Sequence, residues 1–488
     1  MNSSEARLGR FAKRTFLDLW SVPTPYIKKG HALHGGDGDE LCDLIVVFGN
    51  DVVLFSDKRC VFGGVSDTQT SWNRWVRRAI HKSARQLGGA LKNISRYRDQ
   101  LYEDPSCTVR IRLDFPAEDD MRVHLIAVAN GIREACIQHY GDGSGSLPFY
   151  SDHPIELISS DSLPFVLGPV EIDGCFVHVL DEASIEFVMG HLDTASDFMA
   201  YLMAREKFLS DKSFNKAITG EEDLLALYLY KGRPTSRRWG FDSSLTGIGI
   251  DESWSASLAE DANYKAGRKA NAVSYAWDRI IDYVSDEFGV IGSEESEYRR
   301  GGEVALRCMA TSNRHERRFL ASALVDAQEQ AVSGSLIRRF VRAPTQERTA
   351  FLIVVAPKGE MEMEQYRQWR REHIEDVTVI ACAVFREHVD TVVGIATEPI
   401  NDQGYTFDLA YHREPAWTDA RLAEIETVRK ELGVWKRENF RVNRIMSNEF
   451  PDVANGEYAL KLGVAKAESE CPCGSGKAVR DCCGKPVD

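Results

Sequence analysis

Residues 40–58 read ELCDLIVVFGNDVVLFSDK. Two apolar runs in this stretch, Leu44–Phe48 and Val52–Phe55, flank the dipeptide Gly49-Asn50. A short pair of turn-forming residues between two apolar runs is typical of a β-hairpin, since both residues tolerate the backbone angles of a tight turn. We therefore predict two antiparallel strands joined by this turn.

The register of this hairpin determines which polar side chains meet at its open end. Pairing of Phe48 with Asp51 across the turn carries Asp43 opposite Ser56. Side chains alternate along a strand, so Lys58 lies on the same face as Ser56. The pattern thus predicts a carboxylate, a hydroxyl and an ammonium together at the end of two apolar strands.

Two further acids accompany this group. Glu40 lies just before it in the sequence, whereas Asp57 points to the other face of the sheet. Such a cluster can hold a divalent cation and position a water for attack on a phosphodiester. The alternative is a buried hairpin in which Asp43 and Lys58 only form an ion pair. We favour the catalytic interpretation, because a sheet interior seldom ends in three clustered polar groups.

The pattern resembles the PD-(D/E)XK nuclease superfamily, the restriction-endonuclease-like fold. Its site consists of an acid on one strand and an acid-x-Lys sequence on the antiparallel neighbour. The resemblance implies that Asp43 is the principal ligand of Mg²⁺ or Mn²⁺ and that Lys58 orients the attacking water or steadies the developing charge. Glu40, a second expected metal ligand, matches the acid that some members carry on the preceding helix.

One residue departs from the family pattern. Ser56 stands where the family usually has Asp or Glu. Ser-x-Lys variants exist in the superfamily with a carboxylate supplied from elsewhere, and Glu40 is the candidate here. Asp57 can replace Ser56 only if a bulge turns it to the other face. The number of bound metal ions and the catalytic activity therefore depend on which residue supplies the carboxylate that Ser56 lacks.

A basic segment follows the hairpin. The whole chain has a net charge of −14, yet residues 1–100 hold 16 Lys+Arg against 10 Asp+Glu. Between Ser71 and Arg98 there is no acid, and Trp72 and Trp75 are interleaved with the basic residues. Local basic charge is expected where a phosphate backbone docks, although a solvated helix face is the alternative for any single residue. The predicted nucleic-acid contacts are Arg74, Arg77, Arg78, Lys82 and Arg85.

The spacing from Trp72 to Leu91 predicts a helix, in which Gly88-Gly89 permits close packing. Lys82 and Gln86 lie one turn apart and share a face. Many members of the nuclease superfamily place a Lys or Gln on the helix after the catalytic strands, touching the site. The resemblance therefore implies that role for Gln86 and secondarily for Lys82.

The far end of the chain carries a second motif. Cys471 and Cys473 are followed, after eight residues, by Cys482 and Cys483. Four thiolates can close a tetrahedral zinc site, and a site without an open position is structural. The segment resembles the SEC-C motif of the SecA translocase tail, in which Cys-His often stands for this Cys-Cys. It implies bound Zn²⁺ and a surface for a protein or nucleic-acid partner; a disulfide pair is the alternative.

Composition places limits on the class of protein. The other seven cysteines are scattered, which fits reduced core residues better than a disulfide framework. The first residues lack the apolar core of a signal peptide, and no run of about 18 apolar residues suggests a membrane span. We therefore expect a cytoplasmic protein with no membrane partner; the oligomeric state is left open.

We predict an α/β protein of several parts. Residues 1–208 form a nuclease-like mixed sheet flanked by helices, with a catalytic core at about 35–130; residues 209–271 connect it to a second α/β domain at 272–455; and 466–488 form the zinc knuckle. Strands are expected at 109–115, 123–129, 176–180, 349–356, 377–385 and 391–396, and helices at 183–208, 221–230, 272–288, 313–331 and 420–432.

Three functions remain open. The first, which we favour, is a metal-dependent nuclease that acts on nucleic acid, DNA rather than RNA, and serves bacterial defence by analogy with other members of the family. The second is a degenerate nuclease fold that binds nucleic acid without cutting it. The third is an adaptor whose SEC-C knuckle recruits a partner.

Overall fold

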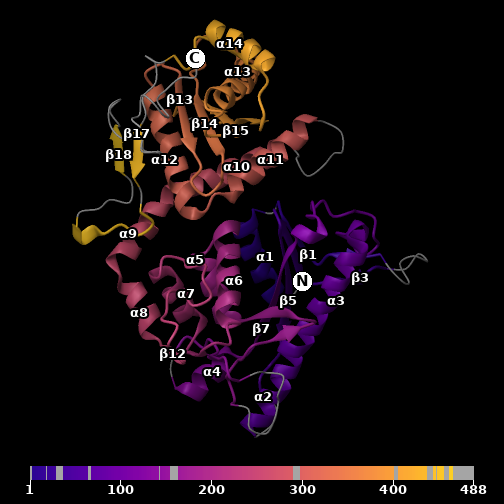
Figure 1. The fold of residues 1–488 in the computed structure, drawn as a ribbon. Helices are drawn as coiled ribbons and strands as arrows, with labels where there is room; N and C mark the ends of the chain where they lie inside the picture. Colours follow the sequence, from indigo (N-terminus) through magenta and orange to yellow (C-terminus); the bar gives the residue numbers. More distant parts are fainter. Residues whose placement is uncertain are drawn as a thin grey trace. The chain divides into compact units, whose positions relative to one another are not determined.

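The computed structural model describes residues 3–17, 19–28, 37–63, 67–141, 143–153, 163–288, 297–400, 405–436, 443–446, 448–455 and 461–464. It consists of two compact units, Met1–Asp261 and Ala262–Asp488 (Figure 1). The predicted zinc knuckle at 466–488, with all four of its cysteines, lies outside the described residues. Among the described residues, no helix combines the length and apolar character that crossing a membrane requires.

The first unit is built on a six-stranded mixed sheet with the order β1-β4-β5-β7-β10-β9. β1, β4 and β5 are antiparallel neighbours, β5, β7 and β10 run parallel, and β9 is antiparallel to β10. The strands are β1 (Ser21–Pro23), β4 (Leu44–Phe48), β5 (Asp51–Arg59), β7 (Arg122–Asn130), β9 (Glu171–Ile172) and β10 (Cys175–Asp181).

The predicted hairpin is present in the predicted register. Phe48 pairs with Asp51 and Leu44 with Phe55, which carries Asp43 opposite Ser56. Gly49 supplies the positive φ, +60°, that the turn requires. Every residue of β4 is buried, as is β5 up to its last two residues, because both faces of the sheet are covered.

Helices cover the two faces of this sheet (Figure 1). One face packs against a continuous helical segment formed by α2 (Thr68–Val76), the π-helical turn η2 (Arg77–His81) and α3 (Lys82–Tyr97). The other face packs against α1 (Ser3–Phe16) and α6 (Ala195–Leu209), where Phe198 contacts the rings of Phe16 and Phe55. Residues facing the first helical layer and residues facing the second are therefore separated by the sheet.

Glycine fixes how closely α3 approaches the sheet edge. A Cβ on Gly88 would lie 2.8 Å from Cγ1 of Ile172, whereas a Cβ on Gly89 would meet nothing. Gly88 is thus required for the close contact with β9, and the helix runs through both glycines without a break.

The rest of the first unit surrounds the central sheet. The residues from 209 to 261, which we expected to be a connecting region, contain strands and helices packed within this unit: β11 pairs with β8, and α7 contacts α5. The elements are β2 (Tyr26–Ile27), β3 (Asp39–Glu40), η3 (Arg98–Gln100), β6 (Leu101–Tyr102), η4 (Glu118–Asp120), α4 (Arg133–Tyr140), β8 (Phe149–Tyr150), α5 (Glu182–His191), β11 (Asn215–Ile218), α7 (Glu221–Tyr230), β12 (Gly247–Ile250) and α8 (Ser253–Glu260).

The predicted strand at 109–115 is wrong. In this segment only Arg110 makes a bridge, to Tyr102. The alternation of apolar and polar residues there arises because Ile111, Leu113 and Phe115 are half-buried in an irregular segment that crosses the surface. Period-two patterning reports one-sided burial, which does not require strand pairing.

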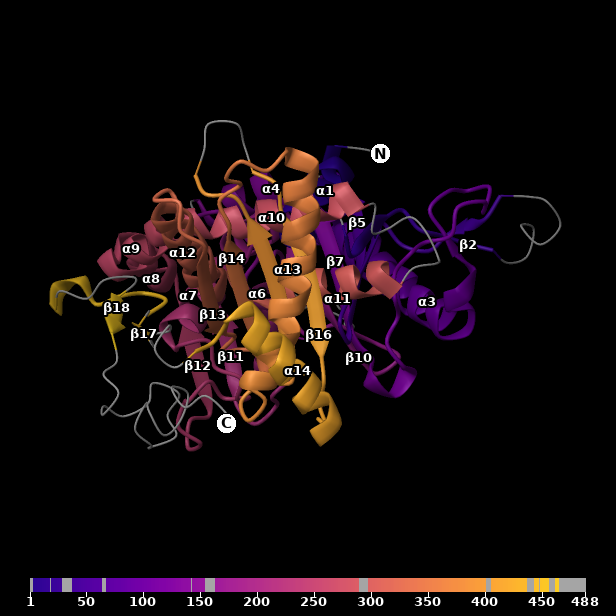
Figure 2. The ribbon, with the colours of Figure 1, turned by 90° about the horizontal axis from the view of Figure 1, so that it is seen from above.

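The second unit holds a four-stranded sheet, β13-β14-β15-β16, with the middle pair parallel. Its core gathers apolar residues of β14, β15 and α13, and Figure 2 shows α13 lying along the sheet. The elements are α9 (Ala262–Ala270), η5 (Asn271–Ser274), α10 (Tyr275–Phe288), α11 (Glu297–Thr311), α12 (Arg314–Ala331), β13 (Ile337–Arg342), β14 (Thr349–Val355), α13 (Met363–Val384), β15 (Thr391–Thr397), β16 (Asp408–Arg413), α14 (Asp419–Leu432), β17 (Asn443–Met446), η7 (Val453–Asn455) and β18 (Lys461–Val464).

The predicted strand at 377–385 is also wrong, because these residues form the last turns of α13. This end of the helix packs on β15 and β16 and against α14, and nearly all of its residues are buried. A helix that is apolar on all sides loses the 3.6-residue pattern, so its sequence looks like a buried strand.

Candidate functional site

A polar cluster lies at the open end of the β4–β5 hairpin. Nζ of Lys58 is 3.8 Å from Oδ2 of Asp43, and that same oxygen accepts a hydrogen bond of 2.7 Å from the backbone N–H of Asp57. A separation of 3.8 Å is too long for a hydrogen bond but lies within the range of an ion pair. The Asp43 side chain is 7% exposed and that of Lys58 is 26% exposed.

Helix α3 adds an amide to this cluster. The hydroxyl of Ser56 donates to Oε1 of Gln86 at 3.2 Å, and Ser56 is fully buried. The helical segment is held against the strand end by Trp75, whose Nε1 donates to the carbonyl of Cys60 at 3.0 Å. The structure therefore brings Asp43, Ser56, Lys58 and Gln86 together on one face of the sheet.

Burial and the repulsion between negative charges raise the pKa values of the acids in the cluster. Burial raises the pKa of Asp43 above its ordinary value, and nearby Lys58 and the Asp57 N–H lower it only in part. Partial desolvation raises the pKa of Glu40 as well, although this residue is exposed, and the negative charge of Asp43 adds to that shift. Ionising either carboxyl group therefore costs free energy, and a bound cation would reduce that cost.

Glu40 occupies a different element from the one the resemblance implies. It lies on β3, which pairs with β2, and it is exposed. The helix that precedes the hairpin is α1, and it carries Glu5, whose charge raises the pKa values of Glu40, Asp43 and Asp57. Glu5 was not among the predicted site residues, although an acid in the first turn of a helix ahead of the hairpin is a signal that could have identified it.

Asp57 points away from the cluster, as its place in the strand predicts. Its carboxylate accepts from Nδ2 of Asn130, whose Oδ1 in turn accepts from Arg7 at 2.6 Å. Strand β5 pairs continuously with β7 through this region, so no bulge turns Asp57 toward Ser56. Burial raises the pKa of Asp57 to about 6. This acid contacts α1 and β7 and does not supply the missing family carboxylate.

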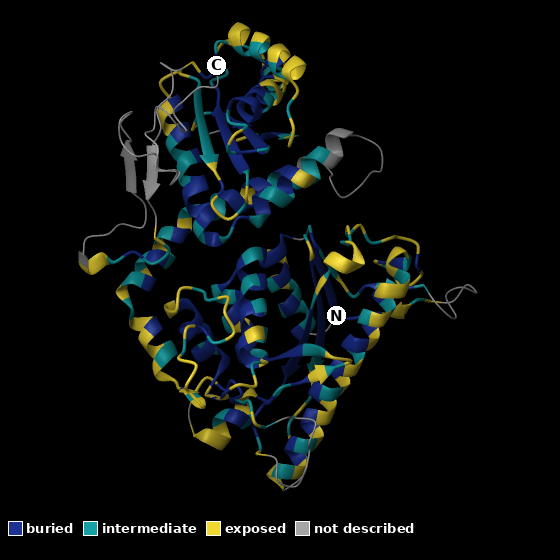
Figure 3. Cartoon of the chain, in the orientation of Figure 1, coloured by how far each residue is buried: buried dark blue, intermediate teal, exposed yellow. Residues whose placement is uncertain are grey.

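The predicted nucleic-acid contacts lie on the outer side of the α2–η2–α3 segment. All five are exposed, and among the described residues none of them forms an ion pair with an acid. Figure 3 shows exposed residues along this helical segment. Two of them, Arg78 and Lys82, are close enough to Cys60 that their charges, with that of Lys58, counteract the burial that raises the pKa of this thiol. Arg78 and Lys82 therefore bring positive charge near the end of β5, where Lys58 lies. The five predicted contacts are Arg74, Arg77, Arg78, Lys82 and Arg85.

The two tryptophans of this segment have a different position from its basic residues. Trp72 and Trp75 are each 2% exposed and stack on one another at a centroid separation of 5.4 Å. Trp72 also contacts Phe165. They form the inner side of the helix, so they fix its position on the sheet and offer no ring to a nucleic-acid base.

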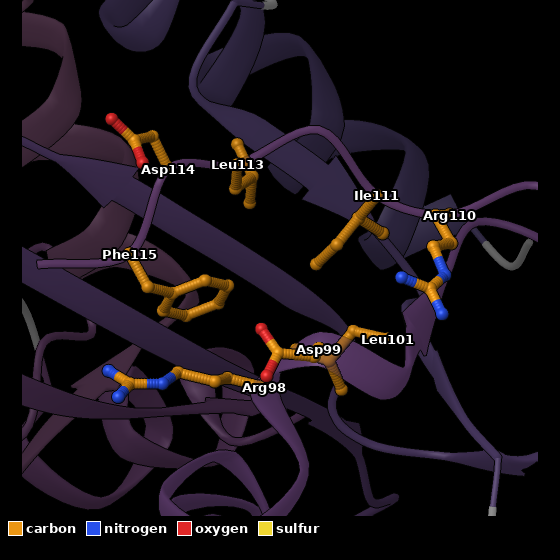
Figure 4. A pocket seen from close by; sticks show the side chains of 8 residues that line it. All are labelled: Arg98, Asp99, Leu101, Arg110, Ile111, Leu113, Asp114 and Phe115. Carbon is orange, nitrogen blue, oxygen red and sulfur yellow. The ribbon is translucent and has the colours of Figure 1, made fainter. Parts of the chain in front are cut away.

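A separate pocket of about 260 Å³ lies beyond the end of α3. Figure 4 shows Arg98 and Arg110 toward opposite ends of it and Asp99 between Phe115 and Leu101. Asp114 also lines it. Two arginines and two aspartates balance each other, so the lining favours neither an anion nor a cation. This pocket shares no residue with the cluster at the end of β5.

No protein-family model, no curated protein and no solved structure matches this chain. The chemistry of the cluster therefore rests on its own residues and their arrangement.

Proposed function

We propose that the first unit is a metal-dependent nuclease that hydrolyses phosphodiester bonds of nucleic acid, with DNA as its expected substrate. The observation that carries this proposal is the convergence of Asp43, Lys58 and the Ser56–Gln86 pair beside a helical segment with exposed basic residues, which form no ion pair within the described part of the chain. A structural ion pair would also place Asp43 and Lys58 at 3.8 Å. It would not explain the nearby second acid, Glu40, whose pKa the charge of Asp43 helps to raise.

The donor types suit a hard divalent cation. Asp43 and Glu40 supply carboxylate oxygens, the ligands that Mg²⁺ and Mn²⁺ prefer, and Glu5 adds negative charge nearby. Such an ion, when bound, lowers the pKa of a water and neutralises charge on the reacting phosphate. The raised pKa values of both carboxyl groups supply the physical reason why this site would take up a cation.

The remaining residues have roles that follow from their positions. The Lys58 ammonium, without a hydrogen bond to Asp43, can orient a water or stabilise the negative charge that develops on the phosphate. Gln86 accepts a hydrogen bond from the buried Ser56 hydroxyl and so holds it in place within the cluster. Arg78 and Lys82, next to Cys60, would hold the phosphate backbone on the side of the site nearest the helix.

A catalytically degenerate nucleic-acid-binding module is the second candidate. It is favoured by one observation: Ser56, with no carboxylate in its place, is buried and hydrogen-bonded to Gln86. This candidate predicts binding that weakens strongly with salt but no hydrolysis in Mg²⁺ or Mn²⁺. The adaptor function, the zinc of the SEC-C segment and a defence role are further proposals. The SEC-C segment, residues 466–488, lies outside the described part of the chain.

The decisive experiment is a cleavage assay on the purified full chain. Supercoiled plasmid, linear duplex DNA and RNA are incubated with Mn²⁺, with Mg²⁺, and with a chelator. The nuclease proposal predicts metal-dependent cutting of at least one DNA substrate that the chelator abolishes. Salt-sensitive binding to the same substrates without cutting would instead establish the binding module, and neither cutting nor binding would exclude both.

A further inference from the structure

A second polar cluster lies on the opposite face of the same sheet. It consists of His124 on β7, His178 on β10 and Glu206 on α6. Val53 pairs with His124, so His124 shares a face with Val53, Phe55 and Asp57 and not with Ser56. The sheet therefore separates this cluster from the proposed nuclease site, and the two share no residue.

The three side chains converge on one point. One potential ligand atom from each lies within 4.8 Å of the other two, and Nε2 of His178 is 3.8 Å from Oε2 of Glu206. Ligand atoms around a tetrahedral Zn²⁺ are roughly 3.3 Å apart, given bonds of about 2.0–2.1 Å. Shifts of about an ångström in these side chains would therefore complete the geometry.

Both histidines present a ring nitrogen that has no hydrogen bond. His124 is 3% exposed and His178 is fully buried, yet Nδ1 of His124 and Nε2 of His178 have no hydrogen-bond partner among the described residues. A buried polar atom without a partner costs about 1–3 kcal/mol. Two such atoms beside a carboxylate are the observation that points to a ligand.

The neighbours of His124 leave its Nδ1 atom free to bind a metal. Asp51 is held by Arg122 through two hydrogen bonds, and its Oδ1 lies 3.1 Å from Nε2 of His124. Arg122 donates to both oxygens of this carboxylate, which can only accept, so the ring proton of His124 lies on Nε2. Nδ1 then carries the free lone pair. A carboxylate behind a histidine in this way is the usual support of a metal-ligating imidazole.

His178 has a competing contact. Nη1 of Arg205 lies 3.2 Å from its Nδ1, and an arginine can only donate, so the proton of the neutral ring sits on Nε2. Ligation through Nε2 requires that this proton move to Nδ1 and that the Arg205 contact open. Arg205 keeps its two hydrogen bonds to Glu221, at 2.8 Å and 2.9 Å, so the guanidinium retains its partner.

We propose that His124, His178 and Glu206 form a binding site for a divalent transition metal, with Zn²⁺ the expected occupant. Two imidazoles and one carboxylate are a ligand set that zinc takes in sites with an open fourth position. The side chain of Glu206 is 40% exposed, which gives the ion a route from solvent and a water as its fourth ligand. This site would be additional to the Mg²⁺ or Mn²⁺ of the proposed nuclease.

The test uses the full chain carrying Cys471→Ser and Cys473→Ser, so that the predicted knuckle cannot bind zinc. Chelator-treated protein is titrated with Zn²⁺ by calorimetry in excess Mg²⁺, and with Co²⁺ by visible absorption. We expect one equivalent to bind, with a Co²⁺ spectrum of nitrogen and oxygen ligation. Glu206→Gln, a change at a partly exposed position, should weaken binding by about tenfold or more.

The matched control is Glu186→Gln, an exposed acid on the neighbouring helix α5, which should bind zinc like the parent. Circular dichroism shows whether each variant is folded. If the parent binds no zinc in excess Mg²⁺, or if Glu206→Gln binds it as tightly as Glu186→Gln, the site does not exist. If the cysteine variant does not fold, the same comparison is made between wild type and Glu206→Gln, where one Zn²⁺ equivalent should bind about tenfold or more weakly in the variant.

Discussion

Asp43→Asn and Lys58→Met are each expected to lower the rate of Mn²⁺-dependent DNA cleavage by about 10²–10³-fold, the range found when one electrostatic group is removed from a reaction centre. Asp43→Asn removes the charge of the proposed principal metal ligand and keeps its shape. Lys58→Met removes the ammonium and keeps most of the apolar stem. Rates are measured on plasmid DNA at saturating protein, with circular dichroism to verify folding.

Two neighbouring changes serve as controls for these variants. Asp57→Asn alters the adjacent acid, which faces Asn130 on the other side of the sheet. Lys92→Met removes a lysine of α3 that pairs with Asp173. Both should cut DNA at nearly the wild-type rate. Undiminished cleavage by purified Asp43→Asn or Lys58→Met would end the nuclease proposal for this cluster.

The second large effect concerns binding. Arg78→Glu combined with Lys82→Glu should weaken the affinity for duplex DNA by about two orders of magnitude at low salt, because two attractive charges become repulsive next to the site. The matched alanine pair should reduce the slope of log K against log salt by about two, one unit for each phosphate that is no longer neutralised. Fluorescence anisotropy over a salt series measures both quantities.

The control for this pair is Lys212→Glu combined with Arg237→Glu, which makes the same change in net charge at two exposed positions away from α2 and α3. It should bind DNA almost as tightly as wild type. Equal weakening by the two pairs would show that net charge, and not the helical surface, governs binding.

The hairpin and its cluster could be predicted from the sequence because the signals are local. A turn between two apolar runs fixes the register, and the register alone places Asp43, Ser56 and Lys58 together. The contact of Gln86 with Ser56 was implied by the family resemblance, and helical spacing gave only the face that Gln86 shares with Lys82. Glu5 could not be placed so readily, since its position depends on how α1 packs against the sheet.

Other features depend on packing that the sequence does not display. The end of α13 looks like a strand because it is buried on all sides, and Trp72 and Trp75 look available to bases although they form the inner side of their helix. His124, His178 and Glu206 come from two strands and a helix far apart in the chain. Only the parallel pairing of β7 with β10 and the packing of α6 bring them together.

The most direct measurement of the central claim is the anomalous scattering of Mn²⁺ in crystals grown with that ion. We expect a peak within bonding distance of an Asp43 carboxylate oxygen, on the side of the sheet that carries Lys58, and its loss in Asp43→Asn. An ordered Asp43 with no Mn²⁺ beside it at saturating concentration would show that Asp43 is not the metal ligand proposed here.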